Sequence, residues 1–194
     1  MTIQIPVDFS AIVFRDAEGK ELPQRWAEPF ARAVLETASA MWRKGTKIEF
    51  RFGTYERVTE EMPEGLSPDP LTEDGFHYLV SRHKAGNGVR VLLVERLDPP
   101  KVRGLSREDA RVCLVTYGAD QGPVSRYLGH ELGHLLGLDH VDAHLNRDPG
   151  QERENAAAMA NLMFSGALSP ANGLNADQLS RVKRSALVRR FGAR

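Results

Sequence analysis

The segment HELGHLLGLDH constrains this chain more than any other. His130 and His134 are four positions apart, so an α-helix would place both imidazoles on one face, one turn apart. Glu131 would be turned about 100° from His130, beside a metal ion without binding it. Gly137 suits the left-handed residue that ends a helix, after which the chain can bring His140 back toward the first two histidines. The spacing predicts three imidazole ligands for one ion.

Three imidazoles with a fourth position left open are typical of a catalytic zinc site. The chain contains a single cysteine, Cys113, which excludes an intrachain disulfide and any zinc site built mainly on thiolates. With one Zn²⁺ in place, Glu131 can take a proton from a bound water. The alternative is an ordinary buried helix whose histidines are satisfied by hydrogen bonds. Five fixed residues match by chance only about once per three million windows, which favours the metal site.

The remaining pattern predicts an α+β domain that spans residues 1–194. Alternating or β-branched segments predict strands, and apolar residues that recur along one face predict helices. Pro123 fits the first turn of the helix that carries the histidines, and Asn175 can cap the last helix. We expect strands over residues 2–14, 47–58, 89–97 and 111–117, and helices over residues 23–43, 123–136 and 175–190.

Residues 59–75 read TEEMPEGLSPDPLTEDG. Prolines and glycines interrupt any period there, and little apolar surface is available for burial, so we expect an exposed loop. Its carboxylates could hold calcium, but their spacing matches no known ligand loop, which leaves calcium possible and unsupported.

The charge balance excludes a strong global field. The 26 basic and 26 acidic side chains cancel, so the net charge does not argue for a nucleic acid or an anionic membrane as partner. No apolar run approaches the roughly 18 residues that span a bilayer, and the first residues do not look like a secretory signal. The sequence leaves the cellular compartment undecided.

The motif HExxHxxGxxH, matched in full at residues 130–140, resembles the signature of the metzincin clan of zinc endopeptidases. Small matrixin-like bacterial members are the nearest in pattern. The resemblance implies a zincin-like fold: a mixed twisted sheet of about five strands with a long N-terminal helix, an active-site helix and a C-terminal helix. It also implies hydrolysis of internal peptide bonds with Glu131 as the general base. We expect a monomer that acts on a protein or peptide substrate. Members of the clan are commonly exported, so the resemblance favours a secreted protein.

The clan also has a methionine-containing turn beneath the metal, and Met163 in ANLMFSG is the candidate. Astacins and serralysins place a tyrosine two residues after that methionine, but this chain has Ser165, so no tyrosine switch is expected. Cys113 lies in an apolar segment and is expected to be a small core residue rather than a latency device.

By resemblance, the substrate would lie along a short edge strand, for which residues 101–106 are the candidate. The segment 164–170 would wall a pocket on the primed side. Asp142 and His144 could be additional ligands or surface residues, and His77 and His83 flank an apparent loop without partner spacing. The candidate substrate-strand residues are Val102, Arg103, Gly104, Leu105 and Ser106.

Two other classes of function remain. A zinc-binding protein-recognition domain without proteolysis is possible, although a structural site has no use for a general base such as Glu131. A binder of anionic surfaces could be argued from residues 181–194, which carry six basic and no acidic side chains. Cations in the last turns of a helix also complement its dipole, so this second reading is the weaker one.

Overall fold

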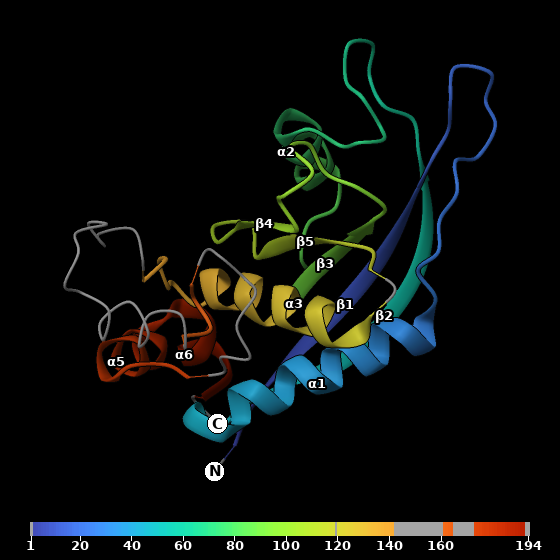
Figure 1. The fold of residues 1–194 in the computed structure, drawn as a ribbon. Helices are drawn as coiled ribbons and strands as arrows, with labels where there is room; N and C mark the ends of the chain where they lie inside the picture. Colours follow the sequence, from blue (N-terminus) through green and yellow to red (C-terminus); the bar gives the residue numbers. More distant parts are fainter. Residues whose placement is uncertain (1, 119, 142–160, 165–172, 193–194) are drawn as a thin grey trace, which may run out of the picture.

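A five-stranded sheet in the order β2-β1-β3-β5-β4 forms the centre of the molecule (Figure 1). The computed structural model describes residues 2–118, 120–141, 161–164 and 173–192. Strands β1, β2, β3 and β5 pair in parallel, and β4 pairs antiparallel with β5 at the sheet edge. The strands are β1 (Ile3–Phe14), β2 (Ile48–Glu60), β3 (Val89–Val94), β4 (Gly104–Arg107) and β5 (Val112–Thr116). The predicted mixed sheet of about five strands is confirmed.

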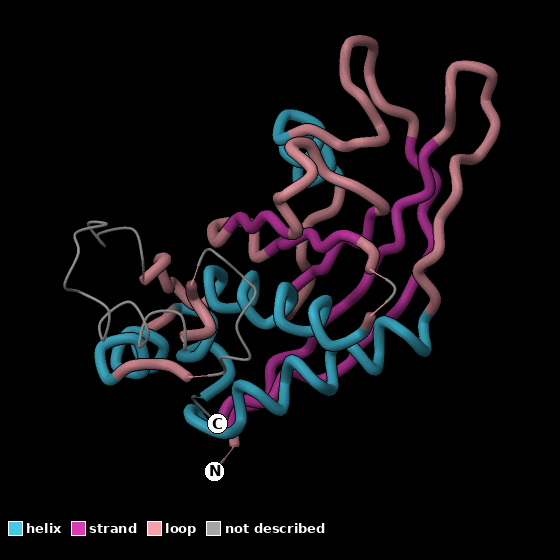
Figure 2. Tube along the Cα trace, viewed as in Figure 1, coloured by secondary structure: helices cyan, strands magenta, loops and turns pink. Residues whose placement is uncertain are grey.

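Helices cover both faces of this sheet (Figure 2). Helices α1 and α3 lie side by side across one face, and α2 packs on the other. The described helices are α1 (Glu28–Thr46), α2 (Glu73–Arg82), α3 (Gln121–Leu135), α5 (Ala176–Arg184) and α6 (Ala186–Gly192). Within the described part of the chain, no helix is long and apolar enough to cross a bilayer.

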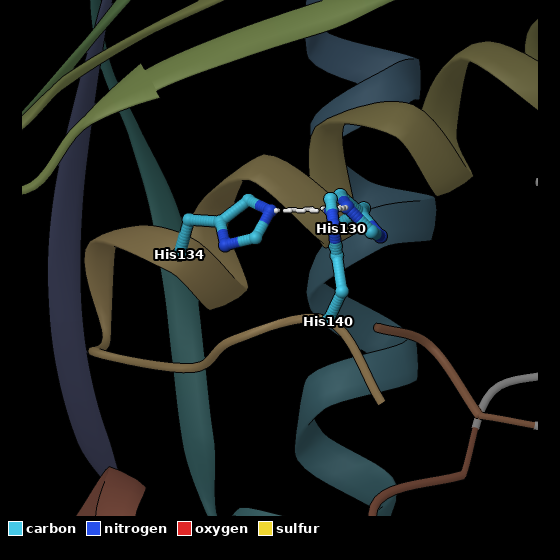
Figure 3. A group of neighbouring side chains, drawn as sticks. All are labelled: His130, His134 and His140. Carbon is cyan, nitrogen blue, oxygen red and sulfur yellow. Dashed lines mark hydrogen bonds between the residues drawn. The ribbon is translucent and has the colours of Figure 1, made fainter. Parts of the chain in front are cut away.

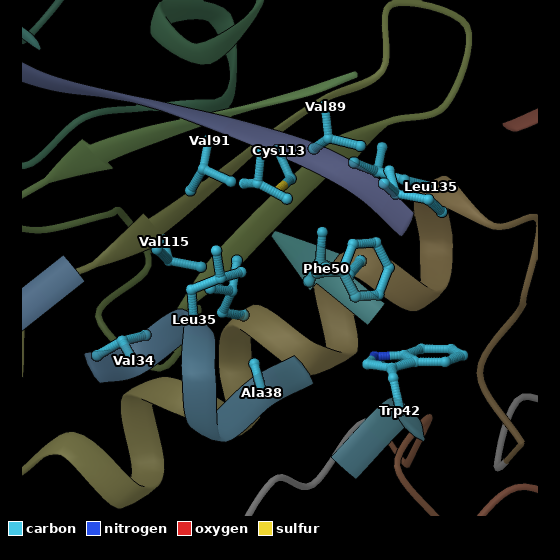
Figure 4. Close-up of a cluster of buried hydrophobic side chains, with 14 of the residues drawn as sticks. Val34, Leu35, Ala38, Trp42, Phe50, Val89, Val91, Cys113, Val115 and Leu135 are labelled. Carbon is cyan, nitrogen blue, oxygen red and sulfur yellow. The ribbon is translucent and has the colours of Figure 1, made fainter. Parts of the chain in front are cut away.

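The main core lies between the sheet and the helices α1 and α3 (Figure 4). Val34 and Leu35 of α1 pack there with Val91 of β3 and Val115 of β5, all nearly or fully buried. Each such side chain contributes on the order of 1.5–3 kcal/mol when buried. The Trp42 indole N–H donates to the carbonyl oxygen of Gly129 at 3.0 Å, so the core joins α1 to α3 directly beside His130.

The first helix begins later than predicted. The expected helix over residues 23–43 starts at Glu28, and Pro29 occupies its first turn. The preceding segment is held to the sheet instead: the Gln24 amide donates to the carbonyl oxygen of Ile12, and the Trp26 indole N–H donates to that of Val94. Trp26 is therefore a buried core residue outside the helix, and a strand carbonyl satisfies its indole N–H.

The prediction of an exposed loop over residues 59–75 is wrong at both ends. Strand β2 runs on through Glu60, which is buried, and α2 begins at Glu73. Between them Leu71 is fully buried in the second core, which lies under α2. Main-chain hydrogen bonds from the Leu71 N–H to Arg96 and from the Asp98 N–H to Leu71 also hold this segment, whose composition looked solvated. Helix α2 itself was not predicted.

The expected single helix over residues 175–190 is two helices. Asn175 caps α5, as predicted, through a reciprocal pair of bonds with Gln178. The chain then breaks at Ser185, whose backbone is extended (φ −59°, ψ 145°). The Ser185 hydroxyl accepts a hydrogen bond from the N–H of Val188, so it caps α6 and competes with helix continuation.

Candidate metal centre

The residues that end α3 reverse the chain, so that the third histidine lies near the first two. Gly137 has φ +80°, as predicted, and its N–H donates to the carbonyl oxygen of His134 at 2.9 Å. The N–H of Leu138 donates to the carbonyl oxygen of Gly133 at 3.1 Å. This pair of bonds is a Schellman motif, which satisfies the last carbonyls of the helix and reverses the chain. The turn carries His140 back over the helix.

Three imidazole nitrogens converge at this point (Figure 3). The Nε2 atom of His130 lies 3.1 Å from that of His134 and 3.0 Å from that of His140. The Nε2 atoms of His134 and His140 are 3.1 Å apart. Tetrahedral zinc bonds of about 2.0–2.1 Å separate two ligand nitrogens by roughly 3.3 Å, so this triangle is close to the size that zinc requires.

The other ring nitrogens show which atoms carry protons. Nδ1 of His130 bonds to the carbonyl oxygen of Leu162 at 2.9 Å, and Nδ1 of His134 bonds to that of Leu138 at 2.7 Å. A carbonyl oxygen only accepts, so both Nδ1 atoms are donors and a neutral ring keeps a lone pair on Nε2. Burial lowers the pKa of His134, with a further contribution from His140, which favours its neutral ring.

Two lone pairs that face each other at 3.1 Å repel unless a cation lies between them. A proton on Nε2 of His140 would satisfy only one of the three contacts at a time. A divalent ion accepts all three lone pairs, and carbonyls that hold the outer N–H are the usual support for metal-bound imidazoles. The donor set therefore fits zinc.

Glu131 lies on the same helix with its side chain turned toward β4. It is 6% exposed, and burial raises its pKa to about 8, while a hydrogen bond from Ser106 opposes the rise. Cys113, on the neighbouring strand β5, is fully buried, which confirms it as a core residue. Burial, and secondarily the Glu131 charge, raises the pKa of its thiol.

Met163 is fully buried in a turn directly beneath α3. A Cβ atom at Gly133 would lie 2.3 Å from the Met163 sulfur, so the side chain occupies the space that this glycine leaves open. The Met163 carbonyl accepts from the N–H of Val141 at 3.1 Å, and Asn161 fixes the turn by accepting from the Met163 N–H at 2.9 Å. The turn thereby contacts the chain next to His140.

A cleft of about 420 Å³ opens between β4 and the Gly137 turn, and Glu131, His134 and His140 line it. Of the candidate substrate-strand residues, Gly104, Leu105 and Ser106 also line it and belong to β4. Val102 and Arg103 precede β4.

Other sequence candidates lie away from this cleft. His77 lies within α2. His83 directly follows α2, at the start of the loop that leads to β3, and is buried against Glu60 at 2.9 Å. Asp142, His144, Ser165 and the rest of segment 164–170 beyond its first residue lie outside the described residues.

The carbonyls of Leu138 and Leu162 were not predicted as part of the site. Both come from the main chain, which every residue type carries, so no side-chain pattern could indicate them. The hydroxyl of Ser106 was predicted only as part of a substrate strand.

The sheet order, the edge strand and the helix that carries the histidines define a zincin-like fold. A crystal structure of archaemetzincin from Methanopyrus kandleri matches 93% of this chain and 94% of that chain, with a TM-score of 0.58 and 16% identity. A zinc-dependent peptidase from Methanocorpusculum labreanum matches 90% of this chain and 99% of that one, with a TM-score of 0.47 and 15% identity. No protein-family model and no curated protein matches the chain. At 16% identity the likeness establishes the fold.

Proposed function

We propose that this chain, as one catalytic domain over residues 1–194, is a zinc-dependent endopeptidase. The observation that carries the proposal is the meeting of three Nε2 atoms at 3.0–3.1 Å. Two of these rings are fixed as donors at Nδ1 by main-chain carbonyls, so their Nε2 lone pairs face the point where a cation can accept them. The archaemetzincin-like fold supports the same assignment.

His130, His134 and His140 would hold one zinc ion. When bound, zinc supplies a Lewis acid that polarises a carbonyl and lowers the pKa of water. Glu131 accepts the proton of the attacking water and passes it to the leaving amine. Its raised pKa, about 8, describes the carboxyl without a neighbouring ion, and the positive charge of an ion favours the ionised form that a base needs.

The peptide substrate would pair with β4, the edge strand of the sheet. An extended peptide that joins an edge gains main-chain hydrogen bonds, and the cleft beside β4 contains Glu131. In this proposal Met163 forms the apolar floor of the site, as the methionine turn of matrixin-like metzincins does.

The test is Glu131→Gln in the zinc-loaded chain. Glutamine keeps the shape but cannot accept the proton, so cleavage of a peptide library, read by mass spectrometry, should fall at least about 10²–10⁴-fold. Zinc content should stay at about one per chain. Glu36→Gln, the same change at an exposed position of α1, is the matched control and should cleave like wild type.

Equal activity in Glu131→Gln and wild type would refute the glutamate base. A zinc-loaded wild-type chain that binds peptides and cleaves none would favour the alternative, a zinc-binding recognition domain.

A further inference from the structure

We propose that a hollow beside the first residues of β1 is a binding site for a small phosphate monoester with an aromatic or other apolar part. The hollow has a volume of about 570 Å³ and shares no lining residue with the cleft of the metal centre. Cavities of this size suit small-molecule ligands. It is lined by Gln4 and Pro6 of β1, Arg51 of β2, Asn87 of the loop before β3, and Arg190 and Phe191 of α6.

The hollow lies on the sheet face that α2 covers only in part. Ile5 belongs to the main core under α1 and α3, so its neighbours Gln4 and Pro6 point to the opposite face. Further along β1, Ile12 on that opposite face packs in the second core beneath α2. The start of the face is bordered instead by α6 and by the loop before β3.

Asn87 is fixed at the rim of the hollow by its neighbours. A Cβ atom at Gly88 would collide with a carbonyl oxygen of β1, so the loop passes directly against that strand. The Arg111 guanidinium donates to the carbonyl oxygens of residues 86–88 at 3.1–3.2 Å. The Arg190 guanidinium donates to Oδ1 of Asn87 at 3.2 Å. Because Oδ1 accepts this bond, the amide nitrogen of Asn87 has its two N–H groups to offer to a ligand.

Positive charge exceeds negative charge around the hollow. Eleven arginines of the described residues pair with a carboxylate within 4.0 Å, but Arg111 and Arg190 form no such pair with a described carboxylate. The carboxylate of Glu49 is shared by Arg43 and Arg51, at 3.4 Å and 3.6 Å. Burial lowers the pKa of Arg111, and the Arg190 charge lowers it further. A bound anion would offset this repulsion.

The donors favour a phosphate over a carboxylate. Arg51 reaches the hollow from β2, Arg190 from α6 and Asn87 from the loop before β3. A carboxylate is planar and singly charged, and one guanidinium fork can satisfy it. A phosphate monoester carries nearly two charges and three acceptor oxygens. Donors on three separate elements, with an excess of positive charge, match the phosphate.

The apolar part of the ligand would rest against Phe191. This side chain is half-buried and packs against the main core, so its ring is a firm wall of the hollow. The Arg190 guanidinium lies 5.9 Å from the centroid of the same ring. A charged donor and an aromatic surface are therefore neighbours, and a phosphate monoester with a ring offers a partner to each.

Calorimetric titration of the full zinc-loaded chain with phenyl phosphate tests the site. Phenyl phosphate should bind about tenfold more tightly than inorganic phosphate, because its ring buries apolar surface against Phe191. Phenol, the uncharged counterpart, should not bind, and benzoate, the carboxylate counterpart, should bind more weakly than phenyl phosphate. Phenol or benzoate that binds as tightly as phenyl phosphate would overturn the proposal.

Two variants test the arginines. Arg51→Gln and Arg190→Gln should each weaken phenyl phosphate binding about tenfold, the loss expected for a hydrogen bond to a charged group. Both side chains are exposed, so each change should leave the unfolding midpoint within about 2 °C of wild type. Arg15→Gln, at an exposed position directly after β1, is the matched control. Unchanged binding in both arginine variants would overturn the proposal.

One further variant separates this site from the metal centre, because a phosphate oxygen can also bind zinc. His140→Ala removes one proposed zinc ligand and should bind phenyl phosphate within about twofold of wild type, since the two sites are independent. Loss of binding in His140→Ala would place the anion at the metal centre and overturn the proposal. Peptide cleavage is not the readout of either titration, so failure of the phosphate site leaves the proposed function standing.

Discussion

In His130 and His134 the two ring nitrogens face different partners, and this division leaves Nε2 free to bind an ion. His130 and His134 each direct Nδ1 to a main-chain carbonyl and Nε2 to the centre of the triad. The first carbonyl belongs to Leu162, far along the chain, and the second to Leu138, in the turn that follows α3. The rings are therefore held ready by partners that do not depend on the ion.

Removal of one ligand should abolish tight zinc binding. His140→Ala leaves two imidazoles on α3, and two ligands hold zinc far more weakly than three. Zinc content after dialysis, measured by atomic emission, should fall from about one per chain to a small fraction. Full occupancy in this variant would refute the three-ligand assignment. His77→Ala, an exposed histidine on α2, should keep its zinc.

The buried His83, which lies outside the metal centre, should make the free energy of unfolding depend on pH. Burial lowers the pKa of His83, and the nearby Glu60 partly offsets this effect. Because the folded pKa is below the unfolded value, His83 adds stability that is fully present above about pH 6.5 and is lost as pH falls through the folded pKa. His83→Gln should therefore show a flatter decline in the free energy of unfolding between pH 7 and pH 5.

Urea unfolding at each pH measures the free energy of unfolding of His83→Gln and of wild type. The difference between these two free energies should change by no more than about 1.4 kcal/mol per pH unit. His77→Gln is the control, because that side chain is 44% exposed. A difference that does not vary with pH would contradict the assignment.

At the scale of elements, local patterns predicted what lies within one helix or one turn. The convergence of the three histidine rings and the left-handed conformation of Gly137 follow from one helix and its closing turn, and the structure contains both. Helix α2 also has a local signal that was missed: Phe76, Leu79 and Val80 recur at helical spacing after the capping residue Thr72. The prolines and carboxylates of the segment before α2 favoured a loop, so this helical pattern was not recognised.

Contacts between elements could not be predicted in the same way. Glu131 meets Gly104 across a gap of 27 positions, and only the packing of α3 against β4 brings them together. The helix breaks at Ser185, whose hydroxyl accepts a hydrogen bond from the N–H of Val188. Such a side-chain bond competes with the main-chain bonds of an unbroken helix.

Two glycines of α3 should respond in opposite directions to the same substitution. A Cβ at Gly129 would make contacts of 3.6 Å or more, whereas one at Gly133 would lie 2.3 Å from the Met163 sulfur. Gly129→Ala should be neutral or stabilise by up to about 1 kcal/mol through helix propensity. Gly133→Ala should destabilise by about 1–3 kcal/mol through overpacking.

Urea unfolding measures both glycine variants, each serving as the control for the other. If Gly133→Ala were as stable as Gly129→Ala, Met163 would not be packed beneath the helix as the structure has it.

At the scale of the whole molecule, the site joins segments that are distant in sequence. His130 contacts the carbonyl of Leu162, and Val141 donates to that of Met163. The Asn161 side chain bonds in turn to Gln178 of α5 at 2.8 Å. An ion bound to the three histidines would therefore stabilise the arrangement of α3, the Met163 turn and, through Asn161, α5. Zinc binding and folding should be coupled.

Removal of zinc should lower the thermal stability of the whole chain. Free zinc at about 100 times its Kd stabilises the folded state by about 2.7 kcal/mol, or about 5–10 °C in the unfolding midpoint of a chain this long. A chelator should remove that increment, and added zinc should restore it. The increment should be smaller at the lower pH, because imidazoles must be deprotonated to bind the ion. Scanning calorimetry with and without chelator at pH 7.5 and 5.5 measures this increment.

His140→Ala is the control and should show little increment at either pH. A wild-type midpoint that zinc does not move would mean that the triad holds no ion in the folded chain.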